Sequence, residues 1–145
     1  MIKDTVSEAK IEVTVHKVHA THVNFECKVL EEIRPGAIHF SGHGMTADEI
    51  KEENIKLQME ESEIDRIFKK GDAIVMENQS CLAEYLFADD LRKMTQTANI
   101  ELDFVFMATC HSQFAAQIFK DAGAKHVIGI NRDDKIVDEA ILTFT

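Results

Sequence analysis

The alternation of apolar and polar residues along the chain predicts strands separated by helices. Residues 11–18, "IEVTVHKV", alternate in this way and are rich in β-branched types, which predicts a strand. Short apolar runs predict further strands over 37–42, 72–78, 103–108 and 126–130. The run 103–108, "DFVFMA", is continuous, as in a strand that is covered on both faces.

Apolar residues at helical spacing predict helices between these strands. Val23, Cys27 and Leu30 recur at helical intervals, and Pro35-Gly36 would end that helix. The stripe after Ser112 consists of Phe114, Ala115, Ile118, Phe119 and Ala122. The other expected helices are one or two turns around Ile64, Ile67 and Phe68, a helix over 89–98, one that Ser112 caps and Gly123 ends, and one that begins in "KIVDEAILTF", 135–144.

Strands that alternate with helices predict a mostly parallel sheet with helices on both faces. We therefore expect an α/β fold, a three-layer α/β/α sandwich. The chain has 145 residues, which fits a single domain over 1–145. The sequence contains no evident linker, repeat or low-complexity tract.

The segment after residue 45 carries an excess of acidic side chains. Residues 48–65 hold eight acids and two lysines, a local balance of −6. Ile55, Leu57 and Met59 alternate with polar residues, which predicts a brief strand or an extended arm. A charge run of this kind is usually a solvated surface, and this interpretation is favoured. The alternative is an arm that borders a cleft and attracts a basic substrate or partner.

Composition narrows the possible partners. The formal net charge of −10 argues against nucleic acid, because phosphate binding needs a surplus of Lys and Arg. A basic peptide or a basic protein surface remains possible. No signal peptide is recognisable, and no apolar run is long enough to span a bilayer, so no membrane association is expected. A reducing, cytoplasmic location follows, in which Cys27, Cys81 and Cys110 can remain thiols.

Two candidate reactive residues follow two of the predicted strands. His43 lies just past the strand 37–42, in "AIHFSGHGM", and Cys110 lies just past the strand 103–108, in "LDFVFMATCHSQF". Sites in parallel sheets gather beyond the carboxyl ends of the strands. If these two strands are neighbours, both side chains face the same crevice.

The residues of these two loops could perform nucleophilic catalysis. A thiol attacks a carbonyl as the thiolate, and an imidazole within reach can take its proton. The positive end of the helix that begins near Ser112 would favour the Cys110 anion. The backbone N–H groups of Gly44 and Cys110 could together bind the oxyanion of a tetrahedral intermediate.

At this point the chain resembles a known family. "IHFSGHG", followed by "FVFMATCHS" and "AGAKHVIGI", resembles the caspase-like cysteine peptidase superfamily, and within it the CHAT domains most closely. The resemblance covers roughly residues 10–144. It implies the three-layer sandwich and endopeptidase activity through an acyl-enzyme, without a cofactor. By motif, Cys110 corresponds to the nucleophile, His43 to the catalytic histidine and Gly44 to the glycine of the oxyanion hole.

The motif around the cysteine also has metacaspase-like features, with two departures. Metacaspases have Asp two residues before the Cys and Gly after the Ser, where this chain has Ala108 and Gln113. Their preference for basic side chains is therefore not implied here. Such folds normally begin with a strand and a helix before the segment 11–18. We therefore expect a domain that is incomplete at the N-terminus, clipped at the C-terminus and part of a larger protein.

Alternatives to the peptidase interpretation exist for each residue and for the chain. Taken singly, His43 could be a turn histidine and Cys110 a buried, inert cysteine. A catalytically silent caspase-like domain that serves protein–protein interaction is the main alternative function. A small-molecule-binding α/β domain is a more remote one.

The remaining histidines do not predict a metal site. His16 and His19 would point to opposite faces of a strand, so they could not both bind one ion there. Together with His22 they are expected to be surface residues near a strand–helix junction. His39 is expected to be a buried, hydrogen-bonded strand residue, and no metal ligand is predicted.

Overall fold

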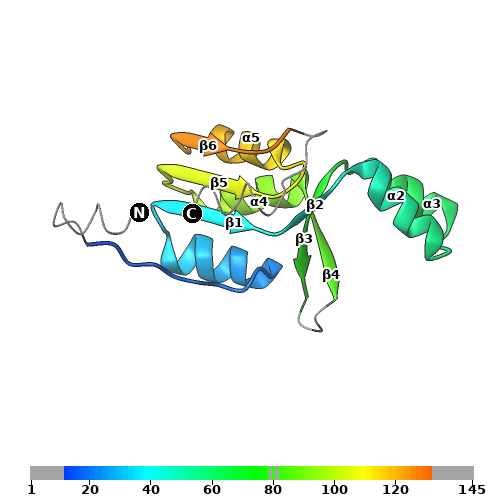
Figure 1. Ribbon diagram of the computed structural model, residues 1–145, viewed down its shortest axis with the longest axis horizontal. Coiled ribbons are helices and arrows are strands. Elements are labelled where there is room, and N and C mark those ends of the chain that lie inside the picture. Colours follow the sequence, from blue (N-terminus) through cyan, green and yellow to red (C-terminus); the bar gives the residue numbers. More distant parts are fainter. Residues whose placement is uncertain (1–11, 79, 81, 132–145) are drawn as a thin grey trace, which may run out of the picture.

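The computed structural model describes residues 12–78, 80 and 82–131 of the chain. This part is an α/β protein with five helices, a parallel sheet of three strands and a small antiparallel sheet of three strands. The α/β class expected from the sequence is confirmed. Figure 1 shows the parallel sheet and its helices as a body from which the small sheet and a pair of helices extend.

The parallel sheet has the strand order β1-β5-β6. It consists of β1 (Ala37–Ser41), β5 (Phe104–Ala108) and β6 (His126–Ile128). These strands confirm three of the predicted ones, and β1 and β5 are direct neighbours that pair up to Ser41↔Ala108. Their carboxyl ends therefore lie side by side, as the candidate site requires.

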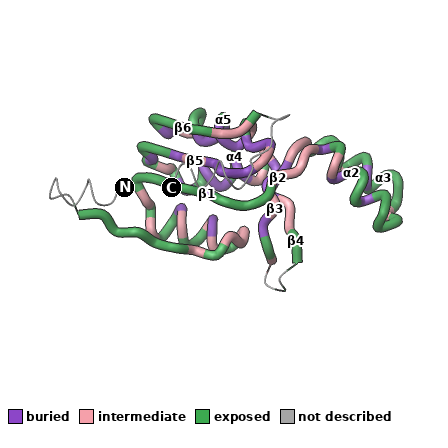
Figure 2. The backbone as a smooth tube through the Cα atoms, in the orientation of Figure 1, coloured by how far each residue is buried: buried purple, intermediate pink, exposed green. Residues whose placement is uncertain are grey.

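Three helices pack on one face of this sheet: η1 (Asn24–Ile33), α4 (Ala88–Ala98) and α5 (Gln113–Asp121). They confirm the helices expected in these regions, although η1 is wound as a π-helix. Figure 2 shows the burial between the sheet and these helices. The shared core is formed by one alternate set of strand residues and by the inner faces of the helices, including Ile38, Phe40, Val105, Met107, Leu30, Leu91 and Phe119.

The second face of the sheet is not covered by any helix among the described residues. The alternate strand residues that point away from η1, α4 and α5 are mostly exposed, for example Phe104 at 38% and Ile128 at 45%. The expected layer of helices on this face is therefore absent from residues 12–131. The helix expected over 135–144 lies outside the described part of the chain, as does Cys81.

The small sheet has the order β2-β3-β4, and all of its pairs are antiparallel. It consists of β2 (His43–Met45), β3 (Ala73–Glu77) and β4 (Ala83–Phe87). The strand predicted over 72–78 is confirmed, whereas β2 and β4 were not predicted. The side chain of Asn78 organises the turn before β4, because its Oδ1 accepts hydrogen bonds from the N–H groups of Ser80 and Leu82. An Asn at this place is a turn signal.

The acidic segment forms two helices, α2 (Ala47–Lys56) and α3 (Glu61–Phe68). The turns expected around Ile64 are confirmed, but the strand or extended arm expected over Ile55–Met59 is wrong. The reason is the cap: Thr46 Oγ1 accepts the N–H of Glu49, three residues on, and so starts a helix that contains Ile55. Figure 1 shows these helices projecting from the body as an arm.

The strand predicted over 11–18 is also wrong for its described residues. Residues 12–18 pair with no strand in the described structure, and Val13 and Val15 are 49% and 63% exposed. This segment meets a sheet at its end, where Glu77 donates its N–H to the Ala20 carbonyl and forms a bridge with Thr21. Alternation signals a strand only where a neighbouring strand completes the hydrogen bonds.

None of the described helices has the length and apolar character needed to cross a bilayer.

Candidate active site

The structure brings together the two segments that carry His43 and Cys110. Each residue lies two positions beyond the last pair of the β1–β5 ladder, Ser41↔Ala108. Past this pair, the first segment turns into β2 and the second forms the loop before α5. The candidate site is therefore built from the adjoining carboxyl ends of two parallel strands.

The two segments come into close backbone contact at Gly44 and Cys110. A Cβ atom placed on Gly44 would overlap the carbonyl oxygen of Cys110, and the carbonyl carbon would lie 3.0 Å away. Only a residue without a side chain allows the two backbones to come this close. Glycine is thus required at position 44 for a reason of packing, beside any role of its N–H group.

The His43 side chain leaves β2 on the other face. Successive side chains of a strand alternate, so the imidazole lies on the face opposite to the one where Gly44 meets Cys110. His43 pairs with Val75, which pairs with Tyr85, and these three share that face. Burial raises the pKa of the Tyr85 phenol, and the negative charge of Glu53 raises it further. His43 itself is exposed. Contact between its ring and the Cys110 thiol remains a prediction.

Cys110 is half-buried in the loop between β5 and α5, whereas Cys27 is exposed on η1. Ser112 occupies the N-cap position of α5, as expected, but it does not cap the helix with its side chain. Its buried hydroxyl donates to the Met107 carbonyl and accepts the N–H of Ile130, each at 3.0 Å. Ser112 therefore ties the loop to β5 and to the chain beyond β6.

His111 is a site residue that the sequence did not reveal. It has a left-handed backbone, with φ of 57°, and its side chain is only 5% exposed. Its Nε2 lies 3.2 Å from Oε1 of Glu49 in the first turn of α2. Its partner is remote in the sequence, so no local pattern identifies this pair. The "TADE" capping signal at 46–49 could have predicted the helix that positions Glu49.

The segments thus contact each other at two successive places. Gly44 meets Cys110, and five residues later Glu49 meets the neighbouring His111. This double contact fixes the loop of Cys110 against the segment that carries His43.

Thr109 adds a further polar group to this loop. Its Oγ1 is buried and has no hydrogen-bond partner among the described residues. An unsatisfied buried hydroxyl costs about 1–3 kcal/mol, so packing alone gives no reason for a polar residue beside Cys110. Of the two positions that depart from the metacaspase motif, Ala108 is buried and Gln113 is exposed.

The other histidines lie away from the candidate site. His39 is exposed and its ring lies 5.0 Å from that of Phe106, so the expectation of a buried, hydrogen-bonded residue is wrong. His19 Nε2 lies 2.8 Å from Glu77, and His22 lies within 3.6 Å of Glu26 and of Glu84. In the described ranges, no group of three or more His, Cys, Asp or Glu side chains is arranged to hold a metal ion.

No protein family, no curated protein and no solved structure matches this chain.

The contact at Gly44 leads to a prediction for Gly44→Ala. The added methyl group would overlap the Cys110 carbonyl and force the two segments apart. We expect the free energy of unfolding to fall by about 1–3 kcal/mol, measured by urea denaturation. The matched control is Gly36→Ala, whose Cβ would meet only Asp103, at 3.9 Å. Equal stability of the two variants would contradict the close approach.

The pair of His111 and Glu49 leads to a second prediction. Glu49→Ala removes the carboxylate next to His111 Nε2, so the loop loses its contact with α2. We expect faster amide hydrogen exchange over residues 109–112, measured by mass spectrometry. Glu52→Ala, an exposed position on the same helix, is the control and should leave exchange in the loop unchanged. Equal exchange in both variants would show that the pair does not hold the loop.

Proposed function

We propose that this protein is a cysteine endopeptidase of the caspase-like, CHAT-domain type that acts through Cys110 and His43. The observation that carries the proposal is the contact of the Gly44 backbone with the Cys110 carbonyl. It joins the two segments in which nucleophile, base and oxyanion donors are expected. The proposal includes a three-layer sandwich, of which residues 12–131 supply the sheet and the helices on one face.

The first half of the reaction forms an acyl-enzyme. The Cys110 sulfur attacks the carbonyl carbon of the scissile peptide bond, and His43 takes the thiol proton. The tetrahedral oxyanion accepts hydrogen bonds from the N–H groups of Gly44 and Cys110. When the C–N bond breaks, His43 gives the proton to the leaving amine, and the acyl group remains on the sulfur as a thioester.

The second half restores the enzyme. A water molecule gives a proton to His43 and attacks the thioester carbonyl, passing through the same oxyanion site. The C–S bond then breaks, the carboxylic acid leaves, and the thiol regains its proton from His43. All the groups belong to the chain, so the reaction requires no cofactor or metal ion.

The acidic arm suggests the charge of the substrate. Asp48 and Glu49 lie in the first turn of α2, and Glu49 contacts the residue next to Cys110. The whole chain has a formal charge of −10. This negative field favours the approach of a basic protein or peptide segment. We propose such a substrate, encountered in the cytoplasm, and a larger protein or assembly around the domain.

A second candidate is a catalytically silent domain of the same type that binds other proteins. The arm of α2 and α3 favours this protein-binding function, because two apolar side chains of the arm, Ile55 and the adjoining Leu57, are 54% and 70% exposed. Apolar side chains on a projecting element are typical of a surface that a partner covers. In this case Cys110 would have no special reactivity.

The two candidates differ in the reactivity of Cys110 towards a limiting amount of iodoacetamide. For a peptidase we expect Cys110 to be alkylated faster than Cys27 and Cys81, as measured by peptide mass spectrometry. His43→Ala should slow alkylation of Cys110 on the order of 10²-fold, because no base then assists the thiol.

The matched control is His39→Ala. His39 is an exposed histidine on β1, and it should not affect alkylation of Cys110. Slow and equal alkylation of all three cysteines would contradict the peptidase and support the silent domain. An equal effect of both histidine variants would show that His43 does not act on the thiol.

A further inference from the structure

The strands of the parallel sheet present apolar side chains and no acidic side chain on their second face. The strand residues that point to this face, called the sheet face below, are Ala37, His39, Ser41, Phe104, Phe106, Ala108, His126 and Ile128. Among them, Phe104 is 38% and Ile128 is 45% exposed. The sheet face thus differs in charge from the chain as a whole, which has a formal charge of −10.

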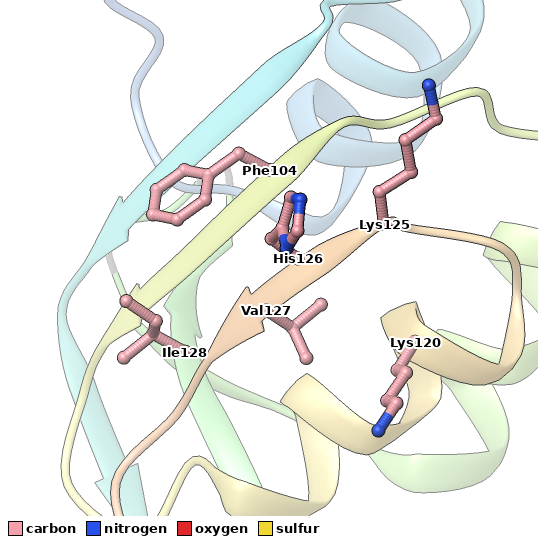
Figure 3. Close-up of a pocket in the computed structure, with 6 residues that line it drawn as sticks. All are labelled: Phe104, Lys120, Lys125, His126, Val127 and Ile128. Atoms are coloured by element: carbon pink, nitrogen blue, oxygen red, sulfur yellow. The ribbon is translucent and has the colours of Figure 1, made fainter.

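A depression of about 500 Å³ lies beside the sheet face, at the free edge of β6. Figure 3 shows that its lining comes from both sides of this strand. The lining contains two lysines and no acid, and consists of Phe104, Lys120, Lys125, His126, Val127 and Ile128. One carboxylate lies close by, because Asp103 is 3.1 Å from Lys125 Nζ, but both side chains are at least 70% exposed. Such a surface pair is weak, so the lysines at this edge can meet another acid.

The arm of α2 and α3 has the opposite character. Ile55 is 54% and Leu57 is 70% exposed. Glu52 precedes Ile55 by three residues, and Glu53 precedes Leu57 by four, so each acid lies on the same side of α2 as an exposed apolar residue. The local balance of −6 over 48–65 surrounds these apolar residues with negative charge.

We propose that the arm of one copy of this chain packs on the sheet face and the β6 edge of a second copy. Both surfaces expose apolar side chains, whose burial contributes about 25 cal/mol per Å². The two surfaces also carry charges of opposite sign, which favours their encounter and fixes their pairing. The arm does not reach the sheet face of its own copy. Ile50 and Ile67 hold its base on the small sheet, and Figure 1 shows it directed away from the parallel sheet.

This contact is head-to-tail, because each copy contributes a different surface. A copy whose arm is bound still has a free sheet face, which can receive the arm of a third copy. The chains therefore add one to the next, as an open series or until a ring closes. None of the residues that form the two surfaces belongs to the candidate active site, so the association does not depend on the proposed reaction.

Sedimentation velocity of the full chain, under reducing conditions and from micromolar to millimolar concentration, tests the association. We expect the average mass of the wild type to rise with concentration, and to rise less in about 1 M salt, where charges are screened beyond about 3 Å. Ile55→Lys should abolish the rise, because it places a cation among the apolar contacts. Val23→Lys, at an equally exposed position (54%) before η1, is the matched control and should associate like the wild type.

The sheet face is tested in the same way. Ile128→Glu should abolish the association, because it places an acid where the acidic arm packs. Lys125→Glu, in the same depression, is a second variant of this surface. Val13→Glu, at a 49% exposed position in the segment 12–18, is the control and should leave the association unchanged. Circular dichroism checks the folding of each variant.

Mixing two defective variants identifies the head-to-tail contact. Ile55→Lys keeps an intact sheet face, and Ile128→Glu keeps an intact arm. Each should remain monomeric alone, whereas an equimolar mixture should form dimers and no larger species, because only one productive contact per pair remains.

Four outcomes would overturn the proposal. The first is a wild type that stays monomeric at all concentrations. The second is an equal effect of Ile55→Lys and Val23→Lys. The third is an association that Ile128→Glu and Lys125→Glu both leave unchanged. The fourth is a mixture of Ile55→Lys and Ile128→Glu that stays monomeric although the wild type associates, because the arm would then not meet the sheet face.

Discussion

The contact between the Gly44 backbone and the carbonyl of Cys110 is the constraint on which the candidate site depends. Two parallel neighbours, β1 and β5, deliver these residues to the same end of the sheet. The contact of Glu49 with His111 fixes the same pair of segments a second time. Without this double contact, the thiol and the expected oxyanion donor would belong to independent loops.

The position of Gly44 beside Cys110 also fixes the position of the small antiparallel sheet, because Gly44 belongs to β2. Gly44 pairs with Ile74, and Ile74 pairs with Leu86. Ile74 and Leu86 are each 1% exposed and belong to the main core. One face of this sheet is therefore anchored in the body of the protein. On the other face, Met45 and its neighbours Ala73 and Phe87 pack against Ile50 of α2 and Ile67 of α3. The arm is thus positioned next to the Cys110 loop by the burial of its base.

Much of the parallel sheet could be predicted from the sequence, because its strands are short apolar runs that end at polar or glycine residues. The stripe of α5 was equally clear, and Ala115, Ile118 and Phe119 are buried as expected. Two signals misled. Residues 12–18 alternate like a strand but pair with none in the described structure, and Ile55 lies in the helix that the cap at Thr46 begins. Local patterns do not contain the tertiary partner that decides such cases.

The candidate site, like the fold, could be predicted from the sequence only in part. The two strand ends could be predicted because each motif ends an apolar run. The pair of His111 and Glu49 could not, because it joins a loop to a helix from a different part of the chain. The direction of the His43 ring depends on β2, a strand whose pairing with β3 the sequence did not indicate.

The most direct measurement is a crystal structure of the chain after alkylation of Cys110 with iodoacetamide. The account predicts that the amide oxygen of the adduct accepts hydrogen bonds from the N–H groups of Gly44 and Cys110. It also predicts that the His43 ring lies within hydrogen-bond distance of the sulfur or of the adduct. A ring that stays beside Val75 and Tyr85, with the adduct directed away from Gly44, would contradict the account.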